Sequence, residues 1–181
     1  STDKHVIEHC SPQVSGLFGG EWCPYGTGGD GPEFPGDQRF DDGAAITFDG
    51  PALEEGVALL GAPAVNLELS VDQPRAFVAV RLSDVKPDGS AARVSYAVLN
   101  LCHRDGHGTP KLLEPGQRYR VRVQLNDCAY SFLPGHRLRV SVSTTYWPMI
   151  WPSPTPVTLC LYAGDCDIVL PVRPTSGGPS L

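Results

Sequence analysis

The chain has 181 residues, of which 41% are hydrophobic and 19% are charged, and its formal net charge is −6. This length and composition predict one soluble globular domain with a sizeable core, and the acidic balance argues against a nucleic-acid-binding protein. Twenty glycines and 18 prolines favour an all-β protein with many turns over a protein of long helices. No apolar run reaches the length of a membrane span, so we expect neither a nucleic-acid nor a membrane partner.

Residues 1–43 are predicted to form a long irregular arm. Eight of the 21 residues from Gly16 to Gly36 are glycine, and three prolines interrupt the remainder. Such a stretch cannot sustain a helix or a central strand. Large side chains such as Trp22 and Tyr25 are spread through it, which predicts that the arm packs onto another surface.

From residue 44 to residue 175 the sequence predicts one short strand after another. Runs of alternating or continuous apolar residues fall at 44–48, 56–60, 65–71, 77–82, 93–101, 119–125, 137–143, 157–161 and 167–170. This spacing is typical of a two-sheet sandwich, and the long loops 103–116 and 145–156 favour a jelly roll over a simple meander. Residues 176–181 are expected to be a flexible tail.

The stretch 130–161 is the most informative part of this pattern. Between residues 137 and 143 apolar residues alternate with arginine and serine, which predicts a strand with one buried face. A loop interrupted by prolines follows it and carries the aromatic residues Tyr146, Trp147 and Trp151.

The polar residues do not form a recognisable catalytic or metal-binding motif. Serines such as Ser95 and Ser143 lie within predicted strands, and the histidines are expected to bond nearby loop backbone, so we expect no catalytic residue. The carboxylates of residues 37–42, and those of Asp84 and Asp88, lack the spacing of a calcium-binding loop. Asp84 and Asp88 are expected to cap a turn, with calcium binding as the alternative, and we expect no cofactor.

The remaining charged residues and the cysteines also allow two structural interpretations each. Arg118, Arg120 and Arg122 share one face of a strand, and we expect nearby carboxylates to balance them, with a phosphate-binding patch as the alternative. Six cysteines occur without a C-x-x-C pair, although six can pair in 15 ways. We expect reduced structural thiols and a cytoplasmic location.

Seven short sequence segments resemble those of a known family. They are GEWCPY (20–25), PGDQRFDD (35–42), RLSDVKPDG (81–89), VLNLCHR (98–104), LLEPG (112–116), LPGHRLRVSVS (133–143) and YWPMIWPSP (146–154). In this order they resemble the C-terminal domain of the cocaine-esterase/X-prolyl dipeptidyl-peptidase (CocE/NonD) family of serine hydrolases, over roughly residues 8–173. The resemblance implies a galactose-binding-like jelly roll that accompanies an α/β-hydrolase domain with a Ser-Asp-His triad.

The chain departs from such an enzyme because it contains no G-x-S-x-G nucleophile elbow. We therefore expect a chain that is inactive alone and that braces the α/β-hydrolase catalytic domain of the same parent polypeptide. The candidate residues that face this domain or its cleft are Trp22, Tyr25, Tyr146, Trp147 and Trp151. Two alternatives remain: a carbohydrate-binding module with coplanar tryptophans, and an oligomerisation module that forms a homodimer.

Overall fold

A computed structural model describes residues 5–21 and 34–174, and nearly all regular structure in these ranges is β-strand. The strands are β1 Val6–Cys10, β2 Ile46–Asp49, β3 Val57–Gly61, β4 Ala64–Val71, β5 Phe77–Val85, β6 Ala91–Asn100, β7 Tyr119–Gln124, β8 Cys128–Phe132, β9 Arg137–Ser143, β10 Thr158–Tyr162 and β11 Asp167–Val169. The helical elements are α1 Arg39–Asp42 and the 3-10 turns η1 Leu101–His103 and η2 Ala163–Asp165. No helix within the described ranges is long and apolar enough to cross a membrane.

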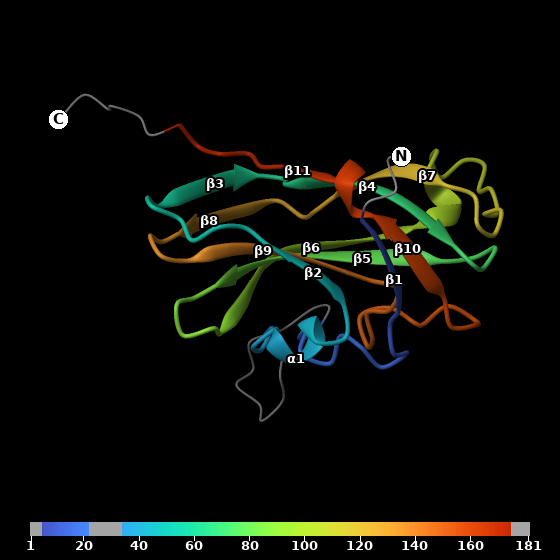
Figure 1. The fold of residues 1–181 in the computed structure, drawn as a ribbon, viewed down its shortest axis with the longest axis horizontal. Helices are drawn as coiled ribbons and strands as arrows, with labels where there is room; N and C mark the ends of the chain where they lie inside the picture. Colours follow the sequence, from blue (N-terminus) through green and yellow to red (C-terminus); the bar gives the residue numbers. More distant parts are fainter. Residues whose placement is uncertain (1–4, 22–33, 175–181) are drawn as a thin grey trace.

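The strands form a β-sandwich in which every pairing is antiparallel (Figure 1). The first sheet follows the order β1-β10-β4-β11, and β7 runs along the other edge of β4. The second sheet has the order β2-β9-β5-β6, and β3 pairs with β8 as a separate ribbon. The predicted all-β sandwich is confirmed, and its long crossovers fit the predicted jelly roll.

The core lies between the two sheets and is built by the period of two that the sequence shows. Leu67 and Leu69 of β4 are at most 1% exposed, and Val80 and Leu82 of β5 are fully buried in the same cluster. Each such side chain stabilises the fold by about 1.5–3 kcal/mol relative to an exposed position. The core therefore buries the inner face of each sheet.

All nine predicted strands are present, with ends that differ by a few residues, and two further strands were not predicted. One of these is β8, and the other is β1, which pairs with β10 from Val6 opposite Tyr162 to Cys10 opposite Thr158. The arm that we expected to be irregular over residues 1–43 thus contains an edge strand of the first sheet. It also contains the four-residue helix α1.

The outer face of the second sheet is also buried, which the sequence pattern did not predict. All nine residues of β5 are buried, and Ser141 and Ser143 of β9 are only 1% and 3% exposed. The 137–143 strand was predicted to have one buried face, and these serines, which point to its other face, are buried as well. Figure 1 shows the reason, because residues 11–19, 36–43 and 144–151 lie over this face; we call these three segments the covering layer.

Candidate functional site

The covering layer is held on the second sheet by a buried ionic network. Arg81, which is 2% exposed, points outward from β5 and donates to Asp42 across 3.0 Å. The other oxygen of Asp42 accepts from Arg139 at 3.1 Å, and Ser141 donates to Asp42 at 2.7 Å. This carboxylate therefore joins the short helix α1 to two strands of the sheet.

Asp41, the preceding residue, connects the two parts of the arm to each other. Its two oxygens accept the backbone N–H groups of Gly16 and Phe18, at 3.0 and 2.9 Å. Gly16 has a positive φ of 115°, and a Cβ atom there would lie 2.6 Å from the carbonyl oxygen of Trp147. Only glycine allows this close approach between the arm and the aromatic loop.

Arg139 continues the network to the surface. Its guanidinium forms two hydrogen bonds with Asp49, at 2.6 and 2.7 Å, and these bonds lower the pKa of the Asp49 carboxyl. The same two bonds, together with the bond to Asp42, raise the pKa of Arg139. Paired charges of this kind stay ionised throughout the neutral range.

Tyr146 belongs to the interior of the covering layer. It is 1% exposed, its hydroxyl is hydrogen-bonded to Arg93, and its ring contacts the ring of Tyr96. The same Arg93 donates to the carbonyl of Gly19 at 2.6 Å. The prediction that Tyr146 faces another domain or its cleft is therefore corrected, because the side chain is buried inside this chain. Burial also raises the pKa of Tyr146.

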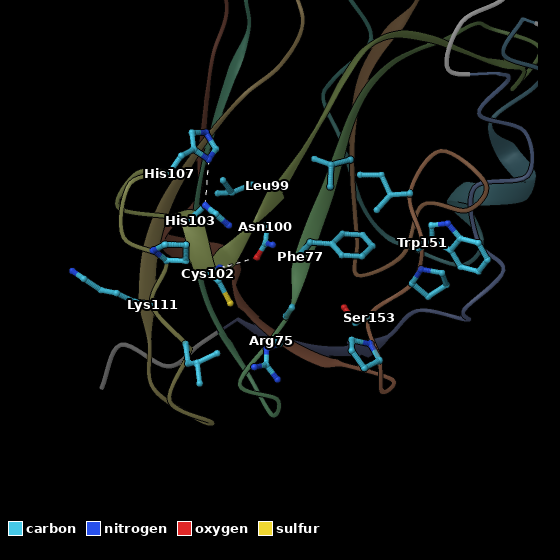
Figure 2. Close-up of a pocket in the computed structure, with 17 residues that line it drawn as sticks. Arg75, Phe77, Leu99, Asn100, Cys102, His103, His107, Lys111, Trp151 and Ser153 are labelled. Carbon is cyan, nitrogen blue, oxygen red and sulfur yellow. Dashed lines mark hydrogen bonds between the residues drawn. The ribbon is translucent and has the colours of Figure 1, made fainter.

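Trp151 has the opposite environment and stands at a groove on the surface. It is 79% exposed, the highest value among the large apolar residues that the structure describes. The groove has a volume of 810 Å³ and lies where β5 begins and β6 ends. Figure 2 shows Trp151 on one side of it and His103 and His107 on the other, with the Phe77 ring between them.

The two tryptophans of the loop do not form a flat platform. The ring centres of Trp147 and Trp151 are 5.0 Å apart, but their planes make an angle of 62°, so one ring edge meets the other ring. A coplanar pair was the expectation of the carbohydrate-binding alternative, and this pair does not provide it. Trp22 and Tyr25, the two candidates on the arm, lie outside the described residues.

A second polar cluster lies under the turn that precedes β9. Asp84, 2% exposed, accepts from the Tyr130 hydroxyl at 2.9 Å and lies 2.8 Å from Nδ1 of His136. The prediction that Asp84 caps a turn is wrong, whereas Asp88 does accept from the backbone and hydroxyl of Ser90. Burial, together with Asp84, raises the pKa of Tyr130 to about 12.

This cluster is not a catalytic triad. Nothing donates from a serine hydroxyl to His136, and in the described part of the chain no serine is hydrogen-bonded to any histidine. His136 was predicted to bond loop backbone, but it bonds a carboxylate. His9 does bond a backbone carbonyl, that of Ala44, at 3.0 Å. Within residues 5–21 and 34–174 no three His, Cys, Asp or Glu side chains are placed to hold a metal ion.

Two of the three arginines in and just before β7 are balanced by carboxylates as predicted, whereas Arg122 contacts only the side-chain oxygen of Asn66, at 3.5 Å, among the described residues. Arg118 donates to Glu68 at 2.7 Å and to Asp165 at 2.6 Å, and Arg120 lies 3.3 Å from Asp167. These contacts leave little positive charge for a phosphate. The five cysteines in the described ranges, namely Cys10, Cys102, Cys128, Cys160 and Cys166, are free thiols.

Comparisons with known proteins agree with this architecture. The family model for the X-Pro dipeptidyl-peptidase C-terminal non-catalytic domain matches residues 1–171. Cocaine esterase of a Rhodococcus species is 29% identical over 116 residues, which is 63% of this chain and 20% of that protein. The chain thus spans about a fifth of the length of this curated relative.

Two solved structures show the same fold over 93% of the chain. An alpha-amino acid ester hydrolase superposes with a TM-score of 0.80 at 24% identity, and the match covers 32% of that chain. A CocE/NonD family hydrolase from Staphylococcus aureus superposes with a TM-score of 0.65 at 14% identity, again over 32% of its length. In each case the likeness is confined to about a third of a larger protein.

Proposed function

The chain belongs to the family of X-Pro dipeptidyl-peptidase C-terminal non-catalytic domains, and from this premise we propose that it braces the α/β-hydrolase catalytic domain of a serine hydrolase and forms one wall of its substrate cleft. The reaction would be acyl-enzyme formation on an ester, amide or X-Pro peptide bond. Its nucleophile would belong to the partner domain.

Exposed apolar side chains on the covering layer support this proposal. Phe40 is 66% exposed, Val14 is 61% exposed, and the rings of Phe18 and Phe40 are in contact with centres 5.0 Å apart. These residues and Trp151 belong to one layer on one side of the sandwich (Figure 1). Several exposed apolar side chains on one layer favour a protein–protein interface there.

The buried network beneath the layer supports the same role. A wall can help position a substrate only if it is rigid, and catalysis loses efficiency when groups are misplaced by about 1 Å. Asp42 and Arg81 tie the covering layer to two central strands, and Gly16 brings the arm against the backbone of the aromatic loop. In the proposed cleft, Trp151 would exclude water and contact the apolar part of the substrate.

The observation that carries the proposal is the exposed Trp151 beside a groove in a chain of this family. The test compares the intact parent polypeptide with its Trp151→Ala and Leu60→Ala variants in hydrolysis of an apolar ester and an X-Pro anilide. Leu60 is a matched control, because it is 61% exposed but belongs to β3, on the far side from the covering layer.

We expect Trp151→Ala to raise KM about tenfold, which corresponds to the loss of one well-packed aromatic contact. Leu60→Ala should leave both kinetic parameters unchanged. The proposal is contradicted if the two variants behave alike, or if this chain by itself turns over either substrate and a single substitution within it abolishes that turnover.

A further inference from the structure

The groove beside Trp151 has a charge opposite to that of the whole chain. Although the chain carries a net charge of −6, no aspartate or glutamate lines the groove. Four lining side chains carry or can carry a positive charge: Arg75, His103, His107 and Lys111. A hollow of this composition attracts anions and repels cations.

The polar groups that are free to bind a ligand are mainly hydrogen-bond donors. Asn100 uses its side-chain oxygen to accept from the backbone of Cys102 at 3.0 Å, which leaves its NH₂ group free. Lys111 pairs with Asp105 at 3.1 Å, and Figure 2 shows its side chain directed away from the groove. Arg75 has no ion pair within the described residues, so it is the permanent cation that remains for a ligand.

The histidine pair adds a further donor. The Nδ1 atoms of His103 and His107 lie 3.3 Å apart, so one ring carries a hydrogen there and the other ring accepts it. When the ring that accepts this hydrogen bond is neutral, its own hydrogen must be on Nε2. The neutral pair therefore presents one N–H group to a ligand.

The other half of the groove is apolar. Phe77 and Trp151 lie there (Figure 2), and the further apolar lining residues include Leu99, Ile150, Pro152 and Pro154. Flat and rigid surfaces of this kind suit an aromatic or branched apolar group. At 810 Å³ the hollow is within the size range of small-molecule sites.

We propose that this groove binds an apolar carboxylate, with the apolar body against Trp151 and Phe77 and the carboxylate among Arg75, Asn100 and the histidine pair. A single unpaired permanent cation matches a single negative charge, and so favours a carboxylate over a dianionic phosphate. That this groove belongs to a substrate cleft rests on the proposed function. In that cleft the ligand would be the carboxylic acid released from a hydrolysed ester. The binding itself needs only this chain.

The test uses this chain alone and isothermal titration with three probes of the same shape: 2-naphthoate, the neutral 2-naphthamide and 2-naphthyl phosphate. We expect the carboxylate to bind at least about tenfold more tightly than the amide, as one charge-assisted hydrogen bond would give. Arg75→Gln should remove this difference while leaving amide binding unchanged. Trp151→Ala should weaken the carboxylate and the amide equally.

Matched controls are Arg122→Gln, an exposed arginine on β7, and Phe40→Ala, an exposed aromatic residue outside the groove. Neither should alter binding of any probe. Equal affinity for naphthoate and naphthamide, tighter binding of the phosphate, no binding of any probe, or an unchanged carboxylate preference in Arg75→Gln would each overturn the inference. These outcomes leave the kinetic test of the proposed function untouched, because that test measures turnover in the parent polypeptide.

Discussion

Nη2 of Arg81 lies 3.0 Å from Oδ1 of Asp42, and the two side chains are only 2% and 4% exposed. One residue comes from the centre of a sheet and the other from the N-terminal segment that covers it. This pair is therefore the main polar link between the sandwich and the surface that we propose to face a catalytic domain.

Breaking this link should unfold the chain more easily. Asp42→Asn removes the carboxylate partner of the buried Arg81 guanidinium, whereas Arg139 keeps Asp49, and breaking a buried pair costs about 3–5 kcal/mol. Lys111→Met removes the exposed pair with Asp105 and should cost less than about 1 kcal/mol. Urea unfolding followed by circular dichroism measures both values, and equal losses would contradict the structural role of Asp42.

Two of the three aromatic residues of the loop, Tyr146 and Trp151, should separate into a structural and a functional residue. Tyr146→Ala leaves a cavity where a fully buried ring packed, and should lower the free energy of unfolding by about 3–5 kcal/mol. Trp151→Ala removes an exposed ring and should change it by less than about 0.5 kcal/mol. Thermal and urea unfolding of the two variants, compared side by side, decide whether the assignment holds.

Acid should weaken the contacts that Asp37 makes with Arg39 of the arm and with Ala91 of β6. Hydrogen bonds from Arg39 lower the pKa of Asp37 from 3.8 to about 2. Because the folded-state pKa is the lower one, the contribution is complete above about pH 4 and is lost as the pH falls toward about 2. Asp49 should add to this loss of stability at low pH, because Arg139 lowers the pKa of the Asp49 carboxyl as well.

Asp37→Asn should therefore flatten the dependence of the unfolding free energy on pH in this window. Arg39→Gln should flatten it less, because the backbone N–H groups of Arg39 and Ala91 still donate to Asp37, and adding this change to Asp37→Asn should have no further effect. Additive effects of the two substitutions in urea titrations at successive pH values would show that the pair is not the cause.

Alkali should act on a different cluster. Burial and the neighbouring Asp84 raise the pKa of Tyr130 from 10.0 to about 12. A raised folded-state pKa means that this contribution is complete below about pH 10 and is lost as the pH rises through about 12. Because the pKa of Tyr146 is raised as well, titration of tyrosinate absorbance should lose one of its late groups in Tyr130→Phe, and an unchanged titration curve in that variant would refute the assignment.

The strands could be predicted because their alternation is set by the core itself. Val121 and Val123 point into the sandwich and Arg120 and Arg122 point out, so the period of two is visible in β7 without any knowledge of its neighbours. The edge strand β1 was not predicted, because its five residues lie next to the glycine-rich stretch and its pairing with β10 spans most of the chain.

The candidate site could be predicted only in outline. Trp151 was identified as a large ring in a rigid loop, but the same criterion selected Tyr146, which is buried. The difference depends on Arg93, more than 50 residues away, whose guanidinium meets the Tyr146 hydroxyl. Asn100 and His103 lie together at the end of β6 and in η1, whereas Arg75 precedes β5, and no short motif in the sequence indicates that Arg75 meets them.

The most direct measurement is amide hydrogen exchange in the intact parent polypeptide and in this chain alone. If the covering layer docks on a catalytic domain, the amides of residues 14–18, 40–43 and 147–151 should exchange more slowly in the parent, while those of β7 exchange equally in both. Equal exchange of the covering layer in the two proteins, with new protection confined to the opposite side at β3 and β7, would contradict the proposed docking.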